Sequence, residues 1–213
     1  MKKLIYSFAL AVLATPAFAQ TDAKAKAILD NLSKNVSALK SLKTNFSLSL
    51  ASANGKTREK RSGSLEMKGP KYHVSLGTQE IFCDGKTVWT YLKDAGEVQV
   101  TDFNAAEQTL SPTKLFTNFY DKEYGYRYVG AKKVAGKNAE VVELIPKTAK
   151  QFRKVELAVD AKTHTLIGGT VTEKNGTVYQ YSVSNYTPNA PVSDAAFTFD
   201  TRKYKNVEVV DLR

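Results

Sequence analysis

A run of short β-strand patterns between Ser62 and Thr101 constrains the fold more than any other feature of the sequence. Turn-forming residues interrupt this run at Gly69-Pro70, Gly77-Thr78, Asp84-Gly85 and Asp94-Ala95-Gly96. Short apolar and β-branched stretches bounded by Gly, Pro and Asp are typical of successive hairpins. An antiparallel sheet buries at least one face, so other parts of the chain must cover it.

A helix is predicted ahead of these strands. Between Asp22 and Ser41 the apolar residues recur every three or four positions and form one stripe: Ala25, Ile28, Leu29, Leu32, Val36 and Leu39. Thr21 or Asp22 can cap the first turn. The stripe predicts packing against the sheet. A helix lying on a membrane surface is the alternative, although this face lacks Trp and Phe.

Strand patterns continue on both sides of the hairpin run. Thr44 to Ser52 alternates with period two, Asn54-Gly55 predicts a hairpin turn, and Thr57 to Lys68 returns as a strand. Five later strands are predicted at Tyr124–Val129, Ala139–Ile145, Lys154–Val159, Leu166–Glu173 and Val178–Tyr186, with a closing segment from Phe197 to Val210. Between the two groups, Ser111-Pro112 begins a short aromatic-rich helix that ends near Tyr120.

The first residues predict export from the cytoplasm. Lys2 and Lys3 precede an apolar run and then Ala17-Phe18-Ala19, so residues 1–19 have the parts of a signal peptide cleaved after Ala19. Residues 20–213 then form a single domain. The formal charge is +10 for the whole chain and +8 without the leader, and the basic residues are scattered. This pattern indicates a solvated surface or weak attraction to an anionic membrane, and no nucleic-acid motif is present.

No catalytic or metal-binding motif is found. The two histidines, His73 and His164, have no metal-ligand spacing and no evident Ser or Cys partner, and no pair of carboxylates stands out. We therefore predict no metal, no cofactor and no enzymatic activity, with an enzyme of unrecognised type as the alternative. The single cysteine, Cys83, cannot form an internal disulfide and is expected to be a small buried residue.

Three segments resemble the outer-membrane lipoprotein carrier family. Residues 62–72 (SGSLEMKGPKY) and 83–91 (CDGKTVWTY) are similar to its G-x-L strand and its D-G-K-x-V-W-x-Y hairpin. Residues 194–200 (DAAFTFD) resemble its closing segment. The resemblance implies an α+β fold: a strongly curved, incompletely closed antiparallel β-barrel or sheet of about 10–11 strands. The N-terminal helix and the short inserted helix would cover its concave apolar face.

The resemblance also implies a function. The chain would be a soluble, monomeric periplasmic carrier that binds the acyl chains of lipoproteins in a hydrophobic cavity. It would receive them from an inner-membrane lipoprotein-releasing ABC transporter and pass them to an outer-membrane acceptor. An envelope lipid or lipoprotein sensor of the same fold is one alternative. A structural envelope protein with a filled core is another, because periodicity does not distinguish a cavity from a packed core.

Twelve apolar positions are candidates for lining such a cavity: Phe46, Leu48, Leu50, Leu65, Met67, Tyr72, Val74, Trp89 and Tyr91 on strands, and Leu115, Phe116 and Phe119 on the inserted helix. Each fits ordinary core packing equally well. Trp89 and Tyr91 share one face and Val88 lies on the other, and we expect the aromatic pair to face the cavity.

One position departs from the family pattern. Gly69 precedes Pro70 where the family usually carries Arg, a residue thought to tie the sheet to its helical lid. Lys68 and Lys71 flank this site, so residues 68–71 are the expected region of a lid latch. A lysine does not reproduce the planar fork of an arginine, and closure of the lid is therefore expected to differ here.

Overall fold

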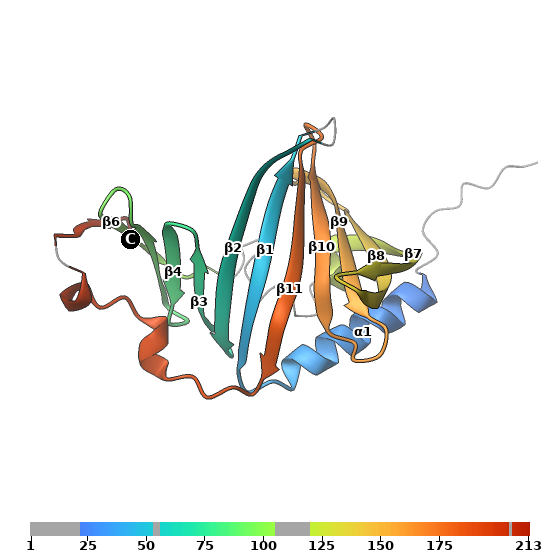
Figure 1. Ribbon diagram of the computed structural model, residues 1–213, viewed down its shortest axis with the longest axis horizontal. Coiled ribbons are helices and arrows are strands. Elements are labelled where there is room, and N and C mark those ends of the chain that lie inside the picture. The colour runs from blue at the N-terminus through green and yellow to red at the C-terminus, as the bar shows by residue number, and fades with distance from the viewer. Residues whose placement is uncertain (1–21, 53–55, 105–119, 205) are drawn as a thin grey trace, which may run out of the picture.

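The computed structural model describes residues 22–52, 56–104, 120–204 and 206–213. These residues form one sheet of twelve strands, flanked by a long N-terminal helix and several short helical turns (Figure 1). The predicted signal peptide lies outside the described residues, as do Leu115, Phe116 and Phe119 of the expected inserted helix.

The sheet contains two antiparallel meanders. The first consists of β1 (Leu42–Ala51), β2 (Thr57–Lys68), β3 (Lys71–Leu76), β4 (Gln79–Cys83), β5 (Thr87–Leu92) and β6 (Glu97–Asp102). The second consists of β7 (Tyr124–Val134), β8 (Lys137–Pro146), β9 (Phe152–Asp160), β10 (Leu166–Glu173) and β11 (Val178–Pro188). From β2 to β6 and from β7 to β11, neighbouring strands are joined by short connections, as the Gly, Pro and Asp punctuation predicted.

Pairing of β1 with β11 joins the two meanders side by side. The strand order is β12-β6-β5-β4-β3-β2-β1-β11-β10-β9-β8-β7. In the central pair, Phe46 lies opposite Val183 and Leu48 lies opposite Tyr181. The last strand, β12 (Glu208–Asp211), is the exception to antiparallel pairing, because it runs parallel to β6 at one edge.

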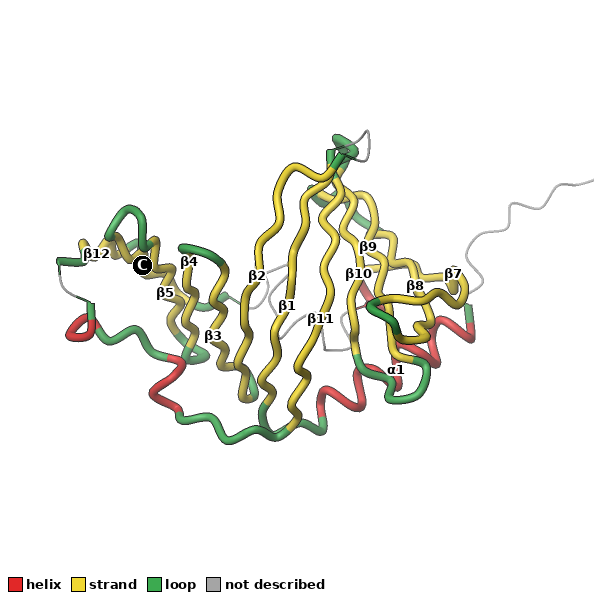
Figure 2. The backbone as a smooth tube through the Cα atoms, viewed as in Figure 1, coloured by secondary structure: helices red, strands yellow, loops and turns green. Residues whose placement is uncertain are grey.

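The architecture corrects part of the expected fold. The α+β class with an N-terminal helix is confirmed, but twelve strands are present rather than 10–11, and the sheet is neither closed nor strongly curled. The segment expected only to close the fold supplies the additional strand, β12. Because β1 and β11 meet in the middle, β7 and β12 become opposite edges instead of approaching each other (Figure 2).

The N-terminal helix, α1 (Ala23–Ser37), forms as the apolar stripe predicted, although it ends four residues earlier. Asp22 caps it by accepting hydrogen bonds from the amides of Lys24 and Ala25 at 3.0 and 3.1 Å. The other carboxylate oxygen accepts one from the amide of Tyr128 in β7 at 2.7 Å, which fixes the helix to the sheet. Among the helices that the structure describes, none has the length and apolarity needed to cross a bilayer.

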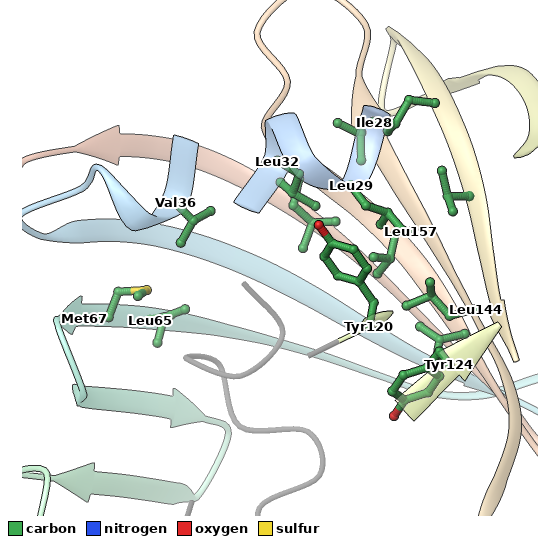
Figure 3. Close-up of a cluster of buried hydrophobic side chains, with 14 of the residues drawn as sticks. Ile28, Leu29, Leu32, Val36, Leu65, Met67, Tyr120, Tyr124, Leu144 and Leu157 are labelled. Carbon is green, nitrogen blue, oxygen red and sulfur yellow. The ribbon is translucent and has the colours of Figure 1, made fainter. Parts of the chain in front are cut away.

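The two faces of the sheet have different covers. Helix α1 covers one face over the second meander, and its buried stripe packs with residues of β7 to β10 (Figures 2 and 3). After β11 the chain passes to the other end of the sheet through the short 3-10 helices η2 (Asp194–Phe197) and η3 (Thr201–Lys203) (Figure 2). This C-terminal segment packs on the opposite face of the first meander through Phe199 and Tyr204.

Candidate functional site

A pocket of about 440 Å³ lies on the face that carries α1, over the middle of the sheet. Its lining residues come from both meanders: Thr44, Phe46, Leu48, Leu65, Val74, Gln151, Phe152, Val155, Leu166, Val171, Glu173, Tyr179, Tyr181 and Val183. Leu166 and Glu173 lie at the two ends of β10, about 23 Å apart at the usual rise of a strand. The pocket is therefore elongated along the strands.

Strand alternation makes this pocket apolar. Phe46 and Leu48 point to the same side of β1, and their direct partners on β11, Val183 and Tyr181, share that side. The serines between them face away, where the hydroxyls of Ser47 and Ser182 are hydrogen-bonded at 2.7 Å. The period-two pattern of the sequence thus places apolar groups in the pocket and polar groups on the other face.

Few polar groups reach the pocket. The hydroxyl of Thr44 donates to the carbonyl of Ser184 at 2.8 Å, so its hydrogen-bonding needs are met within the sheet. Gln151 immediately precedes β9, and Glu173 is the last residue of β10. In the part of the chain that the structure describes, no group of three His, Cys, Asp or Glu side chains has the placement to hold a metal ion. Such a pocket is suited to binding apolar chains by burial.

Four of the nine candidate residues on strands line the pocket, namely Phe46, Leu48, Leu65 and Val74. Met67 and Tyr72 face the same side but are buried in the core that continues beneath α1, and Figure 3 shows Met67 on the side of Val36. Leu50 is half-buried and lies outside the pocket lining.

Trp89 and Tyr91 do not lie in the pocket. They pack on the opposite face of β5 with Phe82 and Phe199, under the C-terminal segment. Val88, the neighbour of Trp89, is buried with the core on the pocket side. Adjacent strand residues point to opposite faces, so burial of Val88 turns the aromatic pair away, contrary to our expectation.

The second meander contributes most of the lining, eight of the fourteen residues, which was not anticipated. Val155, Leu166, Val171, Tyr179, Tyr181 and Val183 are all on strands that the sequence did predict. Tyr179, Tyr181 and Val183 alternate along β11 and so share one face, but nothing in the pattern showed that β11 pairs with β1. That long-range pairing brings the two halves of the pocket together.

The expected latch region contacts the C-terminal segment. The ammonium groups of Lys68 and Lys71 lie 3.0 and 3.6 Å from the carboxylate of Asp194 in η2. The hydrogen bond from Lys68, followed by the charges of both lysines, lowers the pKa of Asp194. Between them, Gly69 has φ +57° in the two-residue turn from β2 to β3. Glycine adopts this angle readily, whereas a residue with a Cβ atom would be strained there.

Cys83 is buried and free, as expected of a small core residue. Burial raises the pKa of its thiol, and the amide of Gly85 donates to its sulfur at 3.4 Å. A thiol held in its neutral form is a poor nucleophile. Cys83 therefore has a packing role beneath the β4–β5 turn.

Comparison with known proteins agrees with the geometry. Residues 37–200 match the family described as "Outer membrane lipoprotein carrier protein LolA". The outer-membrane lipoprotein carrier protein of Haemophilus influenzae strain KW20 Rd is 30% identical over 222 aligned positions, which cover 100% of this chain and 99% of that protein. The corresponding protein of Shewanella halifaxensis is 32% identical over 136 residues, 62% of this chain but only 63% of its own length.

A solved structure shares the fold. An uncharacterized conserved protein from Thermus thermophilus superimposes with a TM-score of 0.61, covering 88% of this chain and 99% of the other, at 14% identity. The family match spans well over half of the chain, and the Haemophilus relative aligns from end to end. The resemblance found in the hairpin motifs is thereby confirmed, and the chain belongs to the LolA family of outer-membrane lipoprotein carrier proteins.

Proposed function

We propose that this protein carries lipoproteins to the outer membrane by enclosing their acyl chains in the pocket between β3 and β9. The observation that supports this most directly is an elongated apolar pocket of about 440 Å³ in a member of a carrier family. This volume is within the range of about 300–1,000 Å³ typical of small-molecule sites. Phe46, Leu48, Leu65 and Val74 are the predicted residues that would contact the chain.

The strength of such binding follows from burial. Each methylene removed from water contributes about 0.8 kcal/mol, so about ten buried methylenes contribute about 8 kcal/mol. That corresponds to a dissociation constant of about 1 μM before the costs of association. Binding of this strength shields an acyl chain in water and still permits its release. Transfer then needs no catalytic group, only an acceptor that binds the same chain more tightly.

Proteins of this family are periplasmic and are carriers rather than enzymes. We further propose that this chain is exported with cleavage after Ala19 and acts as a monomer. An inner-membrane lipoprotein-releasing ABC transporter would load it, and an outer-membrane acceptor would unload it. No step in this cycle requires a metal or a cofactor on the carrier.

The residues expected to latch a lid would instead hold the C-terminal segment. We propose that Lys68 and Lys71 guide the C-terminal segment onto the first meander through Asp194. The Lys68–Asp194 and Lys71–Asp194 contacts are exposed and lie on the face of the sheet opposite the pocket and α1. Opening and closing of the pocket would then not depend on residues 68–71, in contrast to an arginine that ties the sheet to a lid.

The function is tested by titrating the purified mature protein with a fluorescent fatty acid and with a triacylated lipoprotein. Leu48→Glu places a carboxylate in the apolar pocket and is expected to weaken both by about 30-fold or more. Ser49→Glu adds the same charge to the other face of β1 and is the matched control, expected to remain within about twofold of wild type. Failure of the wild-type protein to bind either ligand would refute the proposal.

A further inference from the structure

Tyr181 lines the apolar pocket and carries a hydroxyl group that is buried beside it. It is on β11, directly opposite Leu48 of β1 and Gly169 of β10, and it lines the pocket. Its ring lies over Gly169, because a Cβ atom added to that glycine would be 2.6 Å from the hydroxyl oxygen of Tyr181 and 2.8 Å from Cζ. The hydroxyl therefore reaches over β10, between the lining residues Leu166 and Val171.

This hydroxyl is buried and, among the residues that the structure describes, has no hydrogen-bond partner. Burial raises the pKa of Tyr181 above its ordinary value, so the group stays protonated and remains a donor. The nearest ladder neighbour across Gly169 is Leu157, a buried core residue. Thr44, which also has a hydroxyl group at the pocket, differs because its hydroxyl donates a hydrogen bond to the carbonyl of Ser184.

An unsatisfied buried hydroxyl destabilises the free protein, and phenylalanine would fill the same space without that cost. Buried tyrosine hydroxyls normally find a partner. Tyr181 lines the pocket, but its oxygen has less than 1 Å² of accessible surface, so a bound ligand must displace neighbouring side chains to bring an acceptor to it. These observations indicate that the partner arrives with the ligand.

We propose that the Tyr181 hydroxyl donates a hydrogen bond to the carbonyl oxygen of an ester- or amide-linked acyl chain bound in the pocket. This inference rests on the proposed function and adds a specificity-determining residue to it. The apolar walls hold the hydrocarbon, and Tyr181 recognises the linkage and sets the depth to which the chain enters. The protein thereby prefers acylated molecules to plain hydrocarbons.

The test compares wild type and Tyr181→Phe with three ligands of equal chain length: a fatty-acid methyl ester, a fatty N-methylamide and an alkane. We expect Tyr181→Phe to bind the ester, the amide or both about 5- to 10-fold more weakly, and to bind the alkane as wild type does. Whichever of the ester and amide is affected identifies the linkage. Tyr204→Phe removes a hydroxyl on the opposite face of the sheet and is the control, expected to change none of the three affinities.

The stability of the ligand-free variant supplies the second measurement. We expect Tyr181→Phe to be at least as stable as wild type in urea, since no hydrogen bond is lost without ligand. A less stable variant would mean that the hydroxyl already has a partner, such as a bound water, and would overturn the inference. Equal affinities of variant and wild type for the ester and amide would overturn it too. If wild type binds none of the three ligands, the proposed function fails and this inference fails with it.

Discussion

At the scale of single residues, Gly169 keeps open the space that the ring of Tyr181 occupies. A Cβ at this position would be 2.2 Å from the carbonyl oxygen of Glu156 in β9 as well as 2.6 Å from the Tyr181 hydroxyl. The backbone of a central strand cannot move aside without loosening its ladder. We therefore expect Gly169→Ala to lower the free energy of unfolding by about 2 kcal/mol, measured by urea denaturation.

Gly125 provides the matched control for this substitution. It lies in β7, and the nearest atom to an added Cβ is a backbone oxygen 4.0 Å away. Gly125→Ala should therefore be neutral or stabilising by about 0.5 kcal/mol, through the lower entropy of the unfolded chain. Equal stability of Gly169→Ala and Gly125→Ala would contradict the close approach of Tyr181 and Glu156 to Gly169.

Glu143 in β8 is a buried carboxylate with two cationic partners. The guanidinium of Arg127 and the ammonium of Lys154 donate to it at 2.7 and 3.0 Å. Burial raises its pKa, but the hydrogen bonds from Arg127 and Lys154 outweigh burial, so the pKa lies below its ordinary value of 4.5. A carboxyl group with a depressed pKa in the folded state stabilises the protein above its unfolded pKa and loses this effect as pH falls.

The lowered pKa of Glu143 predicts how the stability difference between wild type and Glu143→Gln changes with pH. At about pH 7 we expect wild type to be more stable than the variant by about 1 kcal/mol, a modest value because Arg127 is 67% exposed. The difference should shrink as pH falls below about 4.5 and disappear once Glu143 is protonated. Urea unfolding of both proteins between about pH 7 and pH 3 measures it. A difference that stays constant over this range would show that the ionised form of Glu143 adds no stability.

At the scale of elements, aromatic packing rather than ion pairing holds the C-terminal segment. The ring of Phe199 is buried, with centroids 5.7 Å from Phe82, 5.3 Å from Tyr91 and 4.5 Å from Tyr204. Phe199→Ala should cost about 3–5 kcal/mol. Asp194→Asn breaks the exposed contacts with Lys68 and Lys71 and should destabilise the protein far less than Phe199→Ala does.

Thermal unfolding of the two variants measures this contrast. Hydrogen exchange adds a local readout, because loss of Phe199 should expose the β6–β12 amides before the rest of the sheet. An Asp194→Asn variant as unstable as Phe199→Ala would show that the lysine contacts, and not the rings, fix the segment. Lys68 and Lys71 would then be the residues that hold the C-terminal segment on the sheet.

The elements themselves were largely predictable from the sequence, whereas their partners were not. The stripe of α1, the Gly and Asp turns and the period-two alternation of β1 are local patterns, and each formed as expected. Alternation shows which residues share a face but not which face is covered. The face of β5 that carries Trp89 and Tyr91 is covered by the C-terminal segment, which lies more than 100 residues further along the chain. The β1–β11 pairing that joins both halves of the pocket is equally non-local.

At the scale of the whole molecule, an open sheet must protect two edges. The β7 edge is protected in two ways. Toward its start, Asp22 accepts the amide of Tyr128, and the ammonium of Lys24 lies 3.8 Å from the centre of the Tyr128 ring. Beyond the irregularity between Tyr128 and Gly130, the exposed Lys132 and Lys133 point to opposite faces of the strand. Bulges and lysines on an edge strand oppose pairing with another chain.

This protection accounts for the proposed monomeric state and makes it testable. Replacing both Lys132 and Lys133 by threonine leaves a neutral, strand-favouring edge, and we expect the variant to self-associate with rising concentration in sedimentation equilibrium, while wild type remains monomeric. The double variant Lys162→Thr with Lys174→Thr removes the same charge from two turns and controls for net charge. Association of both variants alike would assign the effect to lower net charge. If only the β7 variant associates, the edge lysines are what keeps one copy of this carrier from pairing with another along β7.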